Sequence, residues 1–383
     1  MSSLNYRSTW TEVDLSALDF NFRQLKRIIA RNTKIMAVIK CDAYGHGMLP
    51  VAKRLIKLGV DYLGVVSIDE GIILRRNKIE LPILILGNTM SRDVGAVLDY
   101  NLNQTVSDYH LASQLNQKAK RKGKIAGVHI KVDTGMGRLG ILYRDAIKLI
   151  KEIACLSNLR GIGLFTHFPC ADCDPEFTCY QIDIFNQLIR DLKGMGIQFP
   201  LLHAANSMGI MGYPQSHFNL VRPGLMLYGI CPKAGLDIKL KPLLSLKSRI
   251  VYLKRMPPGQ GISYGRSYIT KKETTVAVLP VGYGDGYPRN LSNRADVLIK
   301  GRRFRISGAV CMDQVMVDAG DSRVRVGDEV VLIGRQGKSE ISAEELACLS
   351  QTIPYEIVCS IGSRVGRVYI NSSRKDSSRK ARQ

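Results

Sequence analysis

Long apolar runs are missing from this sequence of 383 residues. A helix that spans a membrane needs ~20 consecutive apolar residues, and we therefore expect no transmembrane segment. The opening stretch MSSLNYRSTWTEVDL has no apolar core followed by small residues, so it does not resemble a secretory signal. Both absences favour a cytoplasmic location.

A disulfide framework is missing too. The nine cysteines are odd in number and scattered, a pattern typical of reduced thiols. The formal net charge of +22 raises the question of nucleic-acid binding. Lys and Arg are spread along the chain, however, and form a dense run only at residues 372–383, which we expect to be a disordered tail. We therefore expect no nucleic-acid partner.

What the sequence does contain is a repeated unit, in which a short β-branched and aliphatic run is followed by a turn and an amphipathic helical stretch. Eight such runs lie at residues 35–39, 62–66, 82–86, 103–106, 128–132, 161–165, 201–205 and 220–221. Helical patterns lie at residues 15–31, 49–58, 110–122, 142–156 and 176–192. Asp14 and Ser67 provide helix start signals, the latter with Glu70 in capping-box spacing. The alternation predicts an N-terminal (β/α)8 TIM-like barrel, with an open doubly wound sheet as the alternative.

The pattern changes after residue 242. Short alternating strands are predicted at residues 248–253, 275–279, 297–300, 314–317 and 329–333, and one helix at residues 343–350. This pattern predicts a C-terminal, mainly antiparallel β domain. The predicted organisation is an N-terminal strand packed with the β domain (residues 1–13), a barrel (14–242), the β domain (243–371) and the basic tail (372–383).

Reactive side chains follow the predicted barrel strands, at the end where barrels of this kind carry their active sites. A lysine that closes a buried strand, as Lys40 does, is costly to desolvate and can form a Schiff base, although a solvent-facing lysine is equally compatible. Ser207 and Gly224 follow the seventh and eighth strands, where barrels commonly bind phosphate. A lysine and a phosphate seat together favour pyridoxal 5'-phosphate (PLP) as cofactor.

Eight motifs then identify a family. AVIKCDAYGHG, KVDTGMGRLG, FTHF, HAANS, VRPGLMLYG, ISYGRSY, LPVGYGDGYPR and CMDQ resemble, in the same order, segments of the PLP-dependent alanine racemases. The first motif differs mainly at Cys41 and Asp42. The resemblance implies an isomerase that interconverts L-alanine and D-alanine, the latter being used for peptidoglycan.

The resemblance also implies a two-base mechanism. Lys40 would carry PLP and act as one base, and Tyr264 would be the other. Racemisation removes a proton from one face of a planar carbanion and delivers one to the opposite face, so two flanking groups are chemically reasonable. In this family the tyrosine comes from the partner subunit, which implies a homodimer with shared sites.

The same resemblance assigns the cofactor contacts. Arg222 would face the pyridine nitrogen, and because guanidinium only donates hydrogen bonds, that nitrogen would stay unprotonated. His167 would lie beside the ring and, with Arg222, help the tyrosine to reach phenolate. The phosphate would be held by Tyr44, Ser207, Gly224, Leu225 and Tyr355.

Substrate contacts follow in the same way. Arg138 would bind the phenolic oxygen of PLP and the substrate carboxylate, which the backbone N–H of Met312 from the partner would bind as well. Tyr283 would narrow the entrance and favour alanine. Lys131 matches a lysine that is carbamylated in some members, where the added charge orients the neighbouring arginine. His203, Asn206 and Asp313 are assigned supporting positions.

Several alternatives stay open at this point. His167, Cys170, Cys173 and Cys179 have a spacing that zinc could use, although we expect free thiols and no metal. The substrate could be serine or another small amino acid. A decarboxylase of basic amino acids would need a carboxylate at the pyridine nitrogen, where this chain offers Arg222. A non-catalytic PLP carrier and an RNA-binding protein are the remaining rivals.

Overall fold

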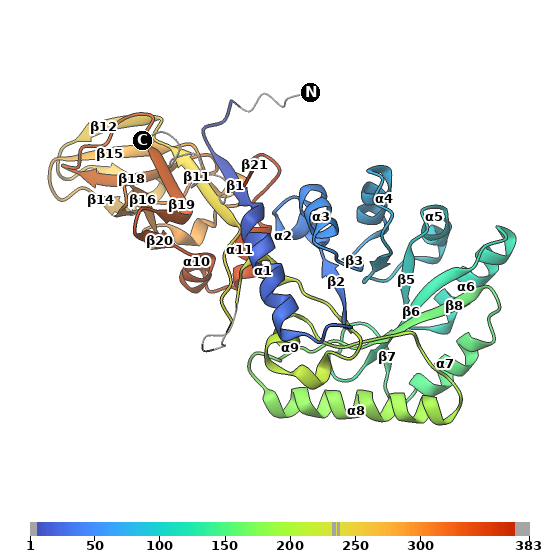
Figure 1. The fold of residues 1–383 in the computed structure, drawn as a ribbon. Helices are drawn as coiled ribbons and strands as arrows, with labels where there is room; N and C mark the ends of the chain where they lie inside the picture. Colours follow the sequence, from blue (N-terminus) through green and yellow to red (C-terminus); the bar gives the residue numbers. More distant parts are fainter. Residues whose placement is uncertain (1–5, 232–234, 236–237, 372–383) are drawn as a thin grey trace, which may run out of the picture.

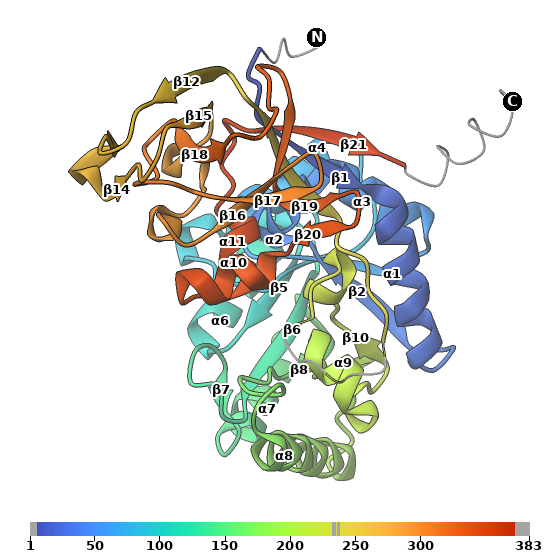
Figure 2. The same ribbon diagram turned by 90° about the vertical axis from the view of Figure 1, so that its left-hand side faces the viewer.

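The computed structural model describes residues 6–231, 235 and 238–371, so the predicted tail at residues 372–383 lies outside the described residues. Figure 1 shows two parts, one with strands and surrounding helices that is coloured mainly blue to green, and a β-rich part that is coloured mainly yellow to red. In the turned view of Figure 2 the β-rich part lies at one end of the molecule, and α8 (Pro175–Gly194) lies at the other.

Eight parallel strands form the barrel, in the order β10, β2, β3, β4, β5, β6, β8, β9. Their bounds are β2 (Lys34–Val38), β3 (Tyr62–Val65), β4 (Ile83–Ile85), β5 (Asn103–Val106), β6 (Ala126–Asp133), β8 (Leu159–Phe165), β9 (Leu201–His203) and β10 (Leu220–Val221), with β7 (Ile141–Leu142) paired to β6. At the seam between β9 and β10 the Arg222 N–H donates to the Ala205 carbonyl at 3.0 Å. The predicted TIM-like barrel is confirmed, and each predicted run overlaps a strand.

Helices surround the barrel because their sequences are apolar on one face only. They are α1 (Leu15–Ile28), α3 (Met48–Lys57), α4 (Ile68–Arg76), α5 (Val94–Asp99), α6 (Tyr109–Arg121), α7 (Ala146–Ala154), α8 and α9 (Ser207–Gly212). In α1 the buried Leu18, Phe22 and Leu25 recur at helical spacing. Burying each such side chain contributes ~1.5–3 kcal/mol. The Asp14 carboxylate caps this helix as predicted, accepting from the Ser16 N–H.

The β-rich part is built mainly from antiparallel strands, as predicted. Its larger sheet has the order β17, β16, β19, β11, β1, β21, with β20 beside β19, and a second sheet has the order β12, β15, β18. The bounds are β1 (Trp10–Asp14), β11 (Leu244–Arg249), β12 (Tyr252–Met256), β13 (Gly261–Ile262), β14 (Tyr268–Ile269), β15 (Thr274–Leu279), β16 (Asp296–Ile299), β17 (Arg302–Arg305), β18 (Val315–Gly320), β19 (Glu329–Gln336), β20 (Ser339–Ile341), β21 (Gly366–Ile370), α10 (Ala343–Ser350) and α11 (Pro354–Cys359). β1 pairs antiparallel with β11 and parallel with β21.

One predicted strand was wrong. Residues 248–253 are not a single strand, because β11 ends at Arg249 and β12 begins at Tyr252. Between them the Ile250 N–H donates to Asp328 and the Val251 N–H donates to Val278. Because the chain changes sheet at this point, an alternating pattern continues across a break that sequence periodicity cannot detect.

A buried asparagine joins α1 to the segment that leaves the barrel. The Asn21 amide donates to the Leu227 carbonyl at 3.0 Å and to the Lys241 carbonyl at 2.8 Å, and its oxygen accepts from the Lys241 N–H at 2.8 Å. Lys241 lies outside any helix or strand and Leu227 lies in a short 3-10 helix (Leu225–Tyr228), and a buried polar group without a partner is costly. Asn21 therefore fixes the connection between the two parts.

We predict that Asn21→Ala lowers the free energy of unfolding by ~1–3 kcal/mol, because it removes the partner of one buried backbone group and of two partly buried ones. Urea denaturation followed by circular dichroism measures this change. Asn77→Ala is the control, since Asn77 is exposed and makes one bond, to Ile73, and it should change stability by no more than ~0.5 kcal/mol. Equal effects of the two substitutions would contradict this role of Asn21.

Candidate functional site

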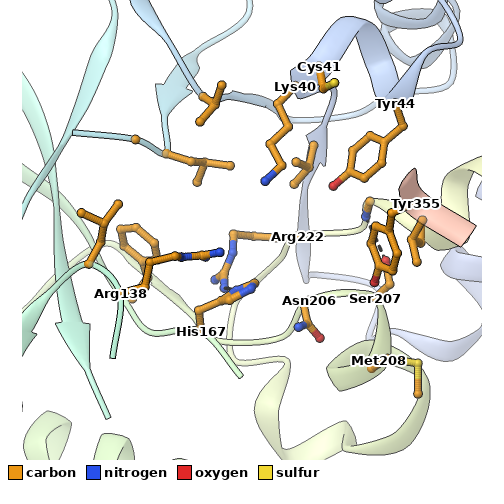
Figure 3. A pocket seen from close by; sticks show the side chains of 18 of the residues that line it. Lys40, Cys41, Tyr44, Arg138, His167, Asn206, Ser207, Met208, Arg222 and Tyr355 are labelled. Carbon is orange, nitrogen blue, oxygen red and sulfur yellow. Dashed lines mark hydrogen bonds between the residues drawn. The ribbon is translucent and has the colours of Figure 1, made fainter. Parts of the chain in front are cut away.

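A cavity of about 530 Å³ opens at the carboxyl ends of the barrel strands. Figure 3 shows side chains from separate strand ends converging on it. Its lining includes the predicted site residues Lys40, Tyr44, Lys131, Arg138, His167, Asn206, Ser207, Arg222, Gly224, Leu225 and Tyr355. Residues far apart in the sequence are thus brought together, as expected for a barrel active site.

Lys40 begins an unusual turn, α2 (Lys40–Tyr44). Four consecutive residues, Cys41, Asp42, Ala43 and Tyr44, have φ between 50° and 55°, which is the left-handed region. This conformation costs non-glycine residues roughly 1–2 kcal/mol each. Such strain persists only where the surroundings enforce it, and it is concentrated at functional sites.

A carboxylate from the neighbouring unit enforces the turn. Glu70 accepts from the Cys41 N–H at 2.6 Å and from the Val66 N–H at 2.8 Å. Ser67 does cap α4, accepting from the Glu70 N–H at 3.3 Å. In the predicted capping box the Glu70 carboxylate would accept from the Ser67 N–H. It accepts from the Val66 and Cys41 N–H groups instead. Glu70 thereby fixes the backbone next to Lys40, a role that sequence reasoning missed.

The amine of Lys40 points into the cavity (Figure 3). Burial lowers its pKa from the usual 10.5, the charge of Arg138 lowers it further, and Glu70 opposes both. Burial is also the main cause that lowers the pKa of Lys131 to about 8, with Arg222 and Arg138 adding to it. A lowered pKa increases the neutral, nucleophilic fraction of a lysine.

Arg222 lies at the inner end of the cavity and is buried. Its guanidinium donates to the carbonyls of Thr166 at 2.7 Å and Ala204 at 2.9 Å. It also contacts Nδ1 of His203 at 2.9 Å and Nδ1 of His167 at 3.3 Å. Burial lowers the pKa of Arg222 to about 9. The pKa of His167 is lowered by burial and then by Arg222, which favours a neutral imidazole that accepts from the guanidinium.

Behind Arg222 and His203 lies a third histidine, His129, that sequence reasoning missed. His203 Nε2 lies 3.0 Å from Nδ1 of the buried His129. Since the guanidinium can only donate to His203 Nδ1, His203 carries its proton on Nε2 and donates to His129. Gly163 makes the space, because a Cβ there would lie 2.2 Å from His129 Nδ1. The ring of Phe165 stacks on His203 with centroids 4.6 Å apart, which completes the support of Arg222.

A seat for an anion lies on the other side of the cavity. Ser207 Oγ accepts from the N–H groups of Gly224 at 3.0 Å and Met226 at 3.3 Å. A Cβ on Gly224 would lie 2.9 Å from the Tyr44 hydroxyl, so glycine keeps this corner open. Burial raises the pKa of Tyr355 to about 12, so its hydroxyl remains a donor. Backbone N–H groups and hydroxyls that converge in this way suit a phosphate.

The charge of the lining indicates the kind of ligand. Within the described part of the chain, two lysines and two arginines line this cavity, and no Asp or Glu does so. Lys131 and Arg222 are buried, and buried cations without carboxylates are costly unless an anion accompanies them. The cavity therefore suits a ligand that carries several negative charges.

The other predicted site residues lie outside the cavity of their own chain. Tyr264 is 75% exposed, Met312 52% and Tyr283 43%. Cys311, which precedes Met312, connects the segments that carry these three residues. Its carbonyl accepts from the Tyr283 N–H at 3.0 Å, and its thiol lies 3.3 Å from Oγ of Ser263, which precedes Tyr264. Asp313 bonds Arg364 at 2.5 Å. These residues form an exposed cluster on the β-rich part, separate from Lys40.

The zinc alternative was tested on the same geometry. Nδ1 of His167 faces the Arg222 guanidinium, which would oppose a cation at that nitrogen. Among residues 6–231, 235 and 238–371 no group of three or more His, Cys, Asp or Glu side chains is arranged to hold a metal ion. None of the helices described is long and apolar enough to cross a membrane.

Comparison with protein families gives two matches that together cover most of the chain. "Alanine racemase, N-terminal domain" matches residues 13–232, and "Alanine racemase, C-terminal domain" matches residues 243–369. The alanine racemase of Halothermothrix orenii is 48% identical over 95% of this chain and 97% of its own length. That of Clostridium novyi is 41% identical over 96% of both chains.

Solved structures agree with these matches. Alanine racemase of Clostridium difficile 630 has a TM-score of 0.92 and 40% identity, covering 96% of both chains. Alanine racemase of Bacillus anthracis with bound L-Ala-P has a TM-score of 0.90 and 37% identity, covering 96% of both chains. Histidine racemase of Leuconostoc mesenteroides has a TM-score of 0.88 and 28% identity, covering 96% of this chain and 99% of that one. The chain belongs to the alanine racemase family of amino-acid racemases.

Proposed function

We propose that this protein interconverts L-alanine and D-alanine with PLP held at Lys40, and so supplies D-alanine for peptidoglycan. The observation that carries the proposal is the cation-lined cavity with Lys40 at the end of β2. PLP fits this cavity by its chemistry, because its aldehyde reacts with a lysine and its phosphate and phenolate are anions. When bound, PLP withdraws electrons from the substrate Cα and makes its proton acidic.

The residues of the chain then have separate tasks. Lys40 takes or returns the Cα proton on one face, a task that its lowered pKa supports. Tyr264 of the partner subunit is assigned to the other face, because the Tyr264 of this chain is exposed and does not line the Lys40 cavity. Met312 and Tyr283 of the partner subunit lie in the same exposed cluster as Tyr264, so they would approach the same site. A homodimer with shared sites follows from this assignment.

Arg222 sets the electronic character of the site. A fixed guanidinium offers only donors, and at its lowered pKa of about 9 it still carries its charge at neutral pH. Such a neighbour does not promote protonation of the pyridine nitrogen, which favours simple reprotonation over transamination. The buried His203 and His129 hold the guanidinium in place.

The substrate carboxylate is assigned to Arg138. Asp133 shapes the loop that carries this arginine, because its carboxylate accepts from the N–H groups of Gly135, Met136 and Gly137 at 2.8 to 3.2 Å. Tyr283 of the partner subunit would narrow the entrance, and a small pocket favours alanine. Because a family relative is named histidine racemase, the family fold alone does not decide the amino acid, and a substrate screen is part of the test.

Lys131 matches a lysine that is carbamylated in some members of the family, and burial lowers its pKa to about 8, which favours the neutral amine that reacts with carbon dioxide. The negative carbamate would lie among positive neighbours and orient Arg138. The predicted domain division at residues 1–13, 14–242 and 243–371 is retained as a proposal as well.

The first prediction concerns cofactor and chemistry. Purified protein supplied with PLP should absorb near ~420 nm, and Lys40→Ala should abolish this band because the covalent anchor is lost. Chiral analysis of L-alanine incubations should show D-alanine formed by the wild type and decreased at least ~100-fold in Lys40→Ala and Tyr264→Phe. Tyr252→Phe, at an exposed tyrosine elsewhere on the β-rich part, is the control. A band without D-alanine would favour a PLP carrier or another substrate.

A second prediction tests the shared site. Lys40→Ala and Tyr264→Phe chains, each inactive alone, should regain activity when they are unfolded, mixed in equal amounts and refolded together. One site of each mixed dimer then has both native groups, so about a quarter of all sites should be active. If mixing restores no activity although mixed dimers form, both bases belong to one chain.

A third prediction concerns pH. A folded-state pKa of about 8 for Lys131, against 10.5 when unfolded, means that the unfolded chain binds the proton more strongly between these values. Stability should therefore rise with pH from about 8 to 10.5. Without PLP and bicarbonate, Lys131→Met should be ~1–3 kcal/mol more stable than the wild type at pH 7, and the gap should close towards pH 10.5.

Urea denaturation at several pH values measures this difference. Lys148→Met, at an exposed position of α7, is the matched control and should show no pH-dependent gap. A wild type that is the more stable protein at pH 7 would mean that the Lys131 amine has a favourable partner there.

A further inference from the structure

Two cysteines lie where the barrel meets the β-rich part, and the proposed chemistry uses neither. Cys41 follows Lys40 in the left-handed turn, and Cys359 ends α11. Both line the Lys40 cavity, and both line a second cavity of about 430 Å³ that is bounded mainly by residues 361–367. They are the only described residues that line both cavities, so together they form the wall between them.

The elements that carry these thiols are in direct contact. A Cβ on Gly45, which follows α2, would lie 2.3 Å from the Val358 carbonyl oxygen and 3.6 Å from Cys359 Cα. The thiols also influence each other. Burial raises the pKa of Cys359 to about 12, the neighbouring Cys41 thiol contributes to the rise, and Lys40 opposes it. Cys41 is exposed and Cys359 is half-buried, so a reagent from solvent meets Cys41 first.

We propose that Cys41 and Cys359 form a thiol modification site, which accepts small disulfides, closes to a reversible Cys41–Cys359 disulfide and thereby weakens cofactor binding at Lys40. The part that concerns the cofactor rests on the proposed function.

The chemistry balances without any other oxidant. The Cys41 thiolate attacks one sulfur of the small disulfide, forms a mixed disulfide and releases one small thiolate. Cys359 then loses its proton, its sulfur attacks the Cys41 sulfur, and the second small thiolate leaves. The two small thiolates take up the two protons. Two cysteines are oxidised, and one small disulfide is reduced to two thiols.

The consequence for Lys40 follows from the turn. A disulfide needs its two Cα atoms roughly 4.4–6.8 Å apart and a defined dihedral angle. The backbone of Cys41 is already held by Glu70 at 2.6 Å and by the strained left-handed conformation. A new covalent bond to α11 competes with these constraints, and the residue that moves with Cys41 is Lys40.

The thiol site is tested first without the cofactor. The apoprotein is incubated with cystamine, alkylated and digested, and the disulfide-linked peptides are identified by mass spectrometry. A peptide that joins Cys41 to Cys359 should form in the wild type and in Cys348→Ser, whose cysteine is exposed on α10, and not in Cys41→Ser or Cys359→Ser. Absence of this peptide from the wild type, or a link from Cys41 to another cysteine, overturns the site.

The coupling is then measured by titrating PLP into apoprotein before and after oxidation. The dissociation constant of the cross-linked wild type should be at least ~10-fold higher, and dithiothreitol should restore it. Cys41→Ser should show no change on exposure to cystamine. An unchanged constant in cross-linked wild type overturns the coupling. Reduced protein that binds no PLP overturns the proposed function, while the peptide map still decides the thiol site.

Discussion

The structure depends on positive charge gathered in one cavity, part of it buried at Lys131 and Arg222, that no carboxylate of the described cavity lining neutralises. Lys40, Lys131, Arg138 and Arg222 all line one cavity, and within the described residues no carboxylate joins them there. Burial and mutual repulsion lower the pKa values of both lysines. The arrangement is unfavourable for an empty protein and favourable for an anionic ligand. The same charge therefore lowers the stability of the empty protein and increases the reactivity of its lysines.

The surrounding fold holds these cations in place. Glu70 and Asp133 are close to the site, but their carboxylates accept from backbone N–H groups and so shape the turns that carry Lys40 and Arg138. Two buried imidazoles, backbone carbonyls and the ring of Phe165 hold Arg222. The left-handed turn after Lys40 fits the same account, since strain is maintained where it positions a reactive group.

The barrel and most residues of its cavity could be predicted from the sequence, whereas several contacts and one strand boundary could not. The eight strand runs and the residues at their ends were identifiable because buried parallel strands have a strong apolar pattern and a fixed active-site end. The roles of Glu70 and His129 were missed because both depend on contacts between different units of the barrel. The break at Ile250 was missed because alternation continues while the chain changes sheet. The exposed position of Tyr264 could be expected only from the family resemblance.

In the proposed function the Lys40 amine, and not another cation of the cavity, forms the covalent link. Reduction of the PLP-loaded protein with borohydride, followed by peptide mass spectrometry, tests it most directly, because Lys131 lines the same cavity and its pKa is lowered as well. The account predicts a pyridoxyl group on the peptide that contains Lys40 and none on the peptide that contains Lys131. A pyridoxyl group on Lys131, or on neither lysine, would contradict it.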